Sequence, residues 1–370
     1  MQVAKILATL SCAVVIPASS MMSSSAMTPP GAPGAVYTMT NTAPNSVMVY
    51  DRSASGLLTP AGQFATGGNG TGSGLGNQGG VVLSQNNRWL FVVNAGSNNV
   101  SLFGVGPDGL HLVDLVPSAG IMPISVTVRR NLVYVLNAGS PNNISGFTLA
   151  PNGKLTPLPG STRMLSAVAT GPAQLEFSPD GDLLVVTEKN TNMIDVFPID
   201  SHGLPSARMS IASNGPTPFG FSFGLRDQLF VSEAFGGAPN ASAISSYTAN
   251  ANGTLSLISG SVPTTETAAC WVIVTRNGRF AYTTNTGSGS ISGYSIDQNG
   301  QLALLDADGR TAVTGGGSAP IDLALSLDNV LYSLDSGDHK ISAFQVHADG
   351  SLEPLGSVPA PATANGLAAR

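Results

Sequence analysis

The chain has few charged residues and few cysteines. Charged residues make up 10% of the 370 residues, and the formal net charge is −6. The sequence therefore lacks the basic surface of a nucleic-acid-binding protein. Its hydrophobic share of 42% is too high for a disordered acidic chain. Glycine (44) and proline (25) are frequent instead, and because both weaken helix interiors, the composition argues against an all-α protein.

Long hydrophobic runs are also missing, so no membrane-spanning helix is expected. The apolar stretch from Ile6 to Ile16 follows Lys5 and is followed by Pro17 and small residues. This pattern is typical of a secretory signal peptide, which we predict over residues 1–26, with a short linker over residues 27–34. The mature protein would then be secreted, either to the extracellular space or to a periplasm. With Cys12 removed, Cys270 is the single thiol, and no intrachain disulfide can form.

A repeat of about 49 residues runs through the remainder of the chain. In each copy an aromatic residue near the end of a strand precedes a turn glycine by six positions. The seven pairs are Tyr50 and Gly56, Phe103 and Gly109, Phe147 and Gly153, Phe197 and Gly203, Tyr247 and Gly253, Tyr294 and Gly300, and Phe344 and Gly350. Most of these glycines follow Asp or Asn, as in hairpin turns. The period matches the blades of a β-propeller.

Each repeat contains four segments that have the composition of strands. The first repeat begins near Ala35 without an innermost strand, whereas residues 364–369 resemble an innermost strand that has no blade. Pairing the two would close the ring and remove two exposed sheet edges. The sequence thus predicts an all-β, seven-bladed β-propeller over residues 35–370, with four antiparallel strands per blade and a C-terminal strand that joins the N-terminal blade.

The runs Phe177-Ser178-Pro179-Asp180-Gly181 and Asn94-Ala95-Gly96-Ser97-Asn98, on seven blades behind a signal peptide, resemble the seven-bladed lactonase family. That family includes the propeller-type 6-phosphogluconolactonases and the fungal carboxymuconate cyclases. The resemblance implies lactone hydrolysis or a muconate-type cyclisation. Active relatives typically have a histidine after a proline at the start of an inner strand. In this chain Pro123, Pro172, Pro218 and Pro320 are followed by Ile, Ala, Phe and Ile, so whether the protein is an enzyme stays open.

A second repeated position, which we call the marker, lies upstream of each aromatic residue and is always Asn, Asp or Glu. The markers are Asn41, Asn94, Asn137, Glu188, Glu233, Asn285 and Asp335. Propeller topology places them around one mouth of the central channel. Glutamate is a poor turn former, so we predict Glu188 and Glu233 as catalytic carboxylates and Asn94, Asn137, Asn285 and Asp335 as ligand-binding residues. The alternative is that the markers have only a structural role, because Asn and Asp side chains also form hydrogen bonds with the backbone groups of turns.

Other candidates for ligand binding lie at inner-strand starts or in aromatic loops near Glu233. They are Gln174, Phe219, Phe235, Trp271 and Asp322. The oxygen-rich ring would suit a divalent cation in the channel, although no cofactor is required. It would equally bind a polyol or a small acid by hydrogen bonds. The glycine-rich stretch from Thr66 to Gly80 contains a dinucleotide-type motif, but a strand follows it where a helix is needed. We predict a flexible loop draped over the mouth.

These observations predict an exported, monomeric propeller that binds a small polar or cyclic carboxylate compound at its axial mouth. Lactone hydrolysis and muconate-type cyclisation are the candidate reactions. The alternative is a non-catalytic extracellular propeller that binds a protein or a glycan. Neither interpretation involves nucleic acid or a membrane span.

Overall fold

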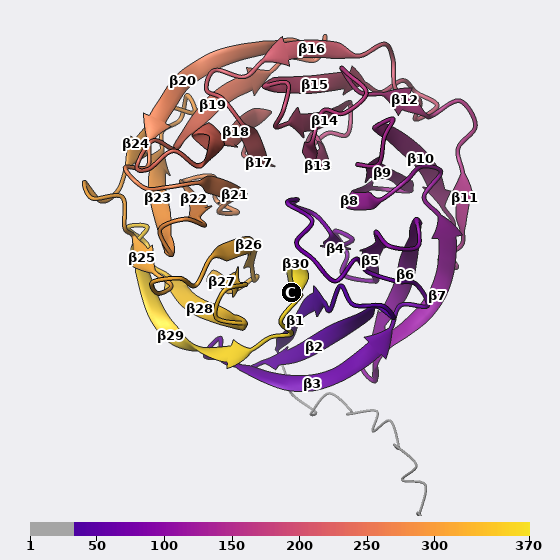
Figure 1. Cartoon of the computed structure of the whole chain (residues 1–370), viewed down its shortest axis with the longest axis horizontal. Helices are drawn as coiled ribbons and strands as arrows, with labels where there is room; N and C mark the ends of the chain where they lie inside the picture. The colour runs from indigo at the N-terminus through magenta and orange to yellow at the C-terminus, as the bar shows by residue number, and fades with distance from the viewer. Residues whose placement is uncertain (1–32) are drawn as a thin grey trace, which may run out of the picture.

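The computed structural model describes residues 33–370, so the predicted signal peptide and nearly all of the linker lie outside the described residues. Seven β-sheets stand radially around one axis (Figure 1). Five of the sheets have four strands and two have five, and neighbouring strands pair antiparallel. The helical content of the described residues is one short 3-10 turn, η1 (Phe235–Gly237). The prediction of an all-β, seven-bladed propeller is confirmed.

The blades follow one another along the chain, and in each the innermost strand lies nearest the central axis. From the axis outward, the first blade has β30 (Asn365–Ala369), β1 (Gly34–Met39), β2 (Ser46–Arg52) and β3 (Leu58–Ala65). The second has β4 (Val81–Leu83), β5 (Trp89–Asn94), β6 (Asn99–Gly106) and β7 (Gly109–Pro117). The third has β8 (Pro123–Arg129), β9 (Leu132–Asn137), β10 (Asn143–Leu149) and β11 (Leu155–Pro157), with β12 (Arg163–Met164) also on β10.

The other four blades repeat this order. The fourth blade has β13 (Pro172–Phe177), β14 (Leu183–Glu188), β15 (Met193–Pro198) and β16 (Met209–Ala212). The fifth has β17 (Pro218–Phe223), β18 (Gln228–Glu233), β19 (Ala243–Ala249) and β20 (Leu255–Pro263). The sixth has β21 (Ala269–Val274), β22 (Phe280–Asn285), β23 (Ser290–Ile296) and β24 (Leu302–Leu304), with β25 (Ala312–Val313) also on β23. The seventh has β26 (Pro320–Leu325), β27 (Val330–Asp335), β28 (Lys340–Val346) and β29 (Leu352–Pro359).

The ring closes through the first blade, where the C-terminal β30 is the innermost strand. β30 pairs antiparallel with β1, with Val36 opposite Ala369, and the two lie side by side in Figure 1. Arg370 Nε donates a hydrogen bond to the Tyr37 hydroxyl at 2.9 Å. Leu367 is buried in a cluster with residues of the seventh blade. The predicted closure is confirmed, and it pairs two edges that would otherwise be free to aggregate.

Six of the seven repeat glycines lie in the turns between the third and fourth strands, and Gly109 is the first residue of the fourth strand β7. Their φ angles run from 81° at Gly203 to 103° at Gly109, a region where a side chain is strained. Three tyrosine hydroxyls donate hydrogen bonds to such a glycine carbonyl in the following blade. The pairs are Tyr134 and Gly203, Tyr282 and Gly350, and Tyr332 and Gly56. The repeat therefore encodes both a turn within a blade and a contact between blades.

Candidate functional site

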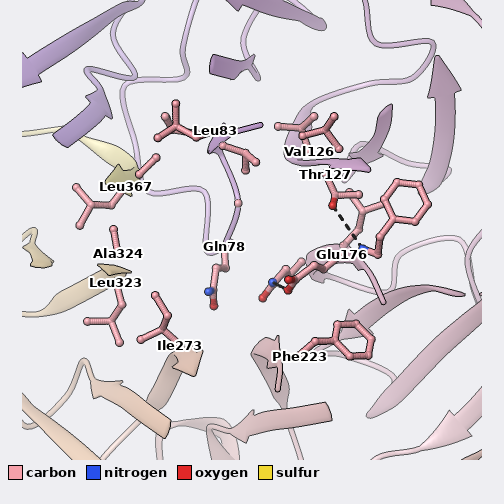
Figure 2. A pocket seen from close by; sticks show the side chains of 18 of the residues that line it. Gln78, Leu83, Val126, Thr127, Glu176, Phe223, Ile273, Leu323, Ala324 and Leu367 are labelled. Atoms are coloured by element: carbon pink, nitrogen blue, oxygen red, sulfur yellow. Dashed lines mark hydrogen bonds between the residues drawn. The ribbon is translucent and has the colours of Figure 1, made fainter. Parts of the chain in front are cut away.

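The innermost strands surround a cavity of about 430 Å³ in the central channel (Figure 2). Strands β4, β8, β13, β26 and β30 all contribute to its lining. The cavity extends from Gln78 to the turns at Gln85 and Pro179, where inner strands lead into second strands. It therefore reaches the face opposite the mouth that the sequence predicted as the binding site.

The glycine-rich loop of residues 66–80 closes the channel at the predicted mouth, and Figure 1 shows it reaching the middle of the ring. Gln78 N–H donates to the carbonyl of Ala173 at 3.1 Å. Its side chain donates to Val272 O at 2.8 Å and accepts from Val272 N–H at 3.1 Å. The indole Nε1 of Trp271 donates to Asn77 O. Asn77 Nδ2 also donates to Ile124 O. The expected draping over the mouth is thus seen, with the tip held by inner strands of three blades.

Polar side chains of the channel wall bind the free backbone edge of the next inner strand. Ser125 Oγ accepts a hydrogen bond from Leu175 N–H at 3.2 Å. Backbone N–H groups at the edge of an inner strand need such a partner when they are buried. Gln174 accepts from Phe221 N–H at 2.7 Å and donates to Phe221 O at 2.9 Å. Gln174, a predicted ligand-binding residue, therefore lines the cavity. Its side chain is already engaged in hydrogen bonds that join blades four and five.

Glu176 lies two residues after Gln174 on β13 and lines the same cavity. Gln174 Nε2 donates to Glu176 Oε2 at 3.0 Å, the one side-chain hydrogen bond of this carboxyl among the described residues. Glu176 is partly exposed, but its exposed surface faces the inside of the channel (Figure 2). Burial within the channel raises the pKa of its carboxyl to about 8. Sequence analysis missed Glu176, although strand alternation from Gln174 would have indicated it.

Asp322 on β26, another predicted ligand-binding residue, also lines this cavity and is buried. Burial raises the pKa of its carboxyl well above the usual value, and the N–H of Leu323, which donates to Oδ1 at 2.8 Å, opposes that shift. The channel thus contains two carboxyl groups whose pKa values are raised by burial. Arg129 is the one Lys or Arg among the described residues that line the cavity.

Six of the seven markers end second strands, and all seven are fully buried. None of them lines the cavity in the channel. Five of the markers bind a serine at the third residue of the third strand of their own blade: Asn94 with Ser101, Asn137 with Ser145, Glu233 with Ser245, Asn285 with Ser292, and Asp335 with Ser342. The structure therefore keeps the markers apart, one inside each blade. Their predicted binding roles stay predictions.

The two predicted catalytic glutamates each hold the chain that leads into their blade. Glu188 accepts from Ser166 N–H at 2.9 Å and from the Thr191 hydroxyl at 2.5 Å. Glu233 accepts from Gly215 N–H at 2.7 Å and from the Ser261 hydroxyl at 2.6 Å. These hydrogen bonds give both carboxylates a structural role. A catalytic role for either stays a prediction.

Two of the three predicted aromatic residues come together beneath the tip of the loop. The rings of Phe219 and Trp271 have centroids 5.0 Å apart, and both belong to a small buried cluster with Cys270. Lys189 Nζ lies 4.5 Å from the Phe219 ring centroid. Phe235 lies in η1, outside this cluster, and is partly exposed.

Within residues 33–370, no three side chains of His, Cys, Asp or Glu are grouped so that they could hold a metal ion. The predicted channel cation, with amide as well as carboxylate oxygens as ligands, stays a prediction. The same residues include no helix of the length and apolar character needed to cross a bilayer.

The comparisons with known proteins identify the fold. No family model matches the chain, and no curated protein matches its sequence. A putative 6-phosphogluconolactonase from Bacteroides uniformis superposes with a TM-score of 0.70 at 16% identity, over 90% of this chain and 99% of its own. A periplasmic gluconolactonase from Pseudomonas aeruginosa gives 0.71 at 16% identity, over 90% and 98%. The resemblance to the lactonase propellers is confirmed at the level of the fold.

The same fold also carries other chemistry. A virginiamycin B lyase from Staphylococcus aureus superposes with a TM-score of 0.54 at 16% identity, over 79% of this chain and 88% of its own. Identities this low establish architecture alone and do not identify a reaction for this chain.

Proposed function

We propose that the channel binds a small, uncharged cyclic ester of the lactone class and hydrolyses it, with Glu176 as the general base. The observation that carries this proposal is a carboxyl group with a raised pKa, facing a cavity of about 430 Å³. A titratable group in a cleft whose pKa is raised toward neutrality is a candidate for proton transfer. The gluconolactonase names of two fold neighbours support the choice of substrate class.

The reaction needs one proton acceptor and one hydrogen-bond donor. Ionised Glu176 takes a proton from a water molecule, whose oxygen forms a bond to the lactone carbonyl carbon. The ring carbon–oxygen bond then breaks, and Glu176 returns the proton to the departing ring oxygen. Asp322, whose pKa is raised by burial, donates a hydrogen bond in its protonated form to the carbonyl oxygen as negative charge develops there. One water is consumed, a hydroxy acid leaves, and Glu176 is again a carboxylate.

The balance of charge in the cavity favours an uncharged substrate. Glu176 and Asp322 line it together with a single basic residue, Arg129, at the end near the turns. A muconate-type polyanion would meet two acidic groups there, which is unfavourable whenever either of them is ionised. We expect the protein to act on its substrate as an exported monomer.

Hydrolysis of glucono-δ-lactone, an uncharged cyclic ester, by the purified full chain, followed by proton release, tests the proposal. Glu176→Gln should reduce kcat by about 100-fold or more, because glutamine keeps the shape but accepts no proton. The double variant Glu188→Gln, Glu233→Gln tests the sequence-based assignment and should retain activity if it folds, which circular dichroism checks. Full activity in Glu176→Gln would refute the assignment. A parent chain that binds the lactone without hydrolysing it would refute the proposed hydrolysis.

A further inference from the structure

The tip of the loop of residues 66–80 presents two consecutive backbone carbonyls to two side-chain donors. Lys189 Nζ donates to Gly76 O, and Trp271 Nε1 donates to Asn77 O. The donors come from different blades, since Lys189 follows β14 and Trp271 lies on β21. Ammonium and indole N–H groups such as these can also donate to carboxylate oxygens.

The ammonium of Lys189 lacks a counter-charge in this position. Gly76 O is its one hydrogen-bond acceptor among residues 33–370, although an ammonium has three donors. No described carboxylate lies within ion-pair distance of it. Burial lowers its pKa to about 8, so the charged form is poorly solvated there. An anionic oxygen would stabilise this group more than a neutral carbonyl does.

The walls around the two donors are apolar and partly flat. The rings of Phe219 and Trp271 pack against Ala173, Ala234 and Cys270. Burial raises the pKa of the Cys270 thiol to about 11, so it is a neutral, unreactive wall group at neutral pH. Aromatic faces beside a cation suit a planar ring that carries a negative charge.

The part of the loop just before its tip is exposed to solvent. Eight of the fifteen residues from 66 to 80 are glycine, and residues 71–74 are exposed. A Cβ at Gly72 or Gly74 would meet nothing within 4 Å, so this part of the loop has free space around it. The tip is anchored by buried Leu75 and by the side chain of Gln78, which lies against Gly220. Only glycine fits at position 220, because a Cβ on that residue would lie 2.2 Å from Gln78 Oε1.

We propose that this mouth is a second binding site, whose donors Lys189 and Trp271 do not line the Glu176 cavity, and that it takes a small planar carboxylate. The loop tip occupies the site with the carbonyls of Gly76 and Asn77 until the ligand displaces it. The carboxylate then accepts from Lys189 Nζ and Trp271 Nε1, and the ring packs against Phe219. The loop is therefore an internal competitor, and its docking reduces the apparent affinity of the site.

Benzoate is a suitable probe, and the two indole N–H signals of the full chain report its binding by NMR. The chain has two tryptophans, so Trp89 in the second blade is an internal reference for Trp271. Benzoate should shift the Trp271 signal and leave the Trp89 signal unchanged. Benzamide, which has the same shape without the charge, should bind at least tenfold more weakly. Equal shifts with benzamide and benzoate would overturn the proposal.

Two variants should change the affinity in opposite directions. Lys189→Met removes the charge and should weaken benzoate binding at least tenfold. Leu75→Ala removes an anchor of the tip and should tighten binding several-fold, because more of the protein then has an open site. Leu57→Ala is the matched control, since Leu57 is exposed on another blade. Weaker binding in Leu75→Ala would show that the tip is part of the binding site and not a competitor of the ligand. Unchanged binding in Lys189→Met would show that Lys189 does not contact the carboxylate. Either result refutes the proposal. Glu176→Gln should bind benzoate normally, so this site and the proposed hydrolysis fail separately.

Discussion

Replacing Asp195 by serine should stabilise the protein at neutral pH, because blade four departs from the pattern of its neighbours. At the third residue of the third strand, five other blades carry a serine that binds the marker. Blade four carries Asp195 there, fully buried and beside the carboxyl of Glu188. Burial, and then Glu188, raise the pKa of Asp195 to about 8, while Ser210 and Arg208 act in the opposite direction.

The size of the effect follows from proton linkage. In the unfolded chain Asp195 ionises near its ordinary pKa of about 3.9, whereas in the folded chain it keeps its proton until about pH 8. Between these values the folded state binds one more proton, so the free energy of unfolding falls by about 1.4 kcal/mol per pH unit. At pH 7 the cost reaches about 4 kcal/mol. The lost contacts to Ser210 and Arg208 are worth about 1 kcal/mol each, which leaves a net gain of about 2 kcal/mol for Asp195→Ser.

Urea unfolding at pH 5, 6, 7 and 8, followed by circular dichroism, measures this difference. The advantage of Asp195→Ser over the parent should grow with pH and be smallest at pH 5. Asp195→Asn, which keeps the size of the side chain but does not ionise, should show the same pH trend. Parallel curves for the parent and both variants between pH 5 and pH 7 would refute the linkage argument.

Three further outcomes are expected. Deleting residues 363–370 removes β30 and the buried Leu367, so the free energy of unfolding should fall by at least about 3 kcal/mol; a truncated chain of undiminished thermal stability would contradict the closure. Lactone hydrolysis should rise about tenfold per pH unit below pH 8 and level off above it, since Glu176 acts as a base only when ionised; a rate independent of pH from 6 to 8 would exclude it as the base. Tyr282→Phe removes the hydrogen bond to Gly350 between blades six and seven and should cost about 1 kcal/mol in urea unfolding, whereas an unchanged midpoint would show that the contact contributes nothing.

The architecture of this protein follows from local, periodic features that a sequence displays directly. A glycine such as Gly203 recurs where the backbone turns with positive φ, and an aromatic residue recurs six positions before it. Counting these pairs yields seven blades, and the unmatched strand at residues 364–369 supplies the missing innermost strand of the first. Because turns and strand alternation depend on neighbours within a few residues, they can be identified without knowing how the chain folds overall.

The site depends on contacts between residues that are far apart in the chain, and only the tertiary structure decided it. Glu176 and Asp322 share one cavity from blades four and seven, and the loop tip at Asn77 meets Trp271 across 194 positions. Polar side chains at the ends of second strands, such as Glu233, turn into their own blades instead of the channel. Sequence determines which strand a residue occupies. Which residues meet in the channel depends on the arrangement of the blades and on the backbone edges that each side chain satisfies.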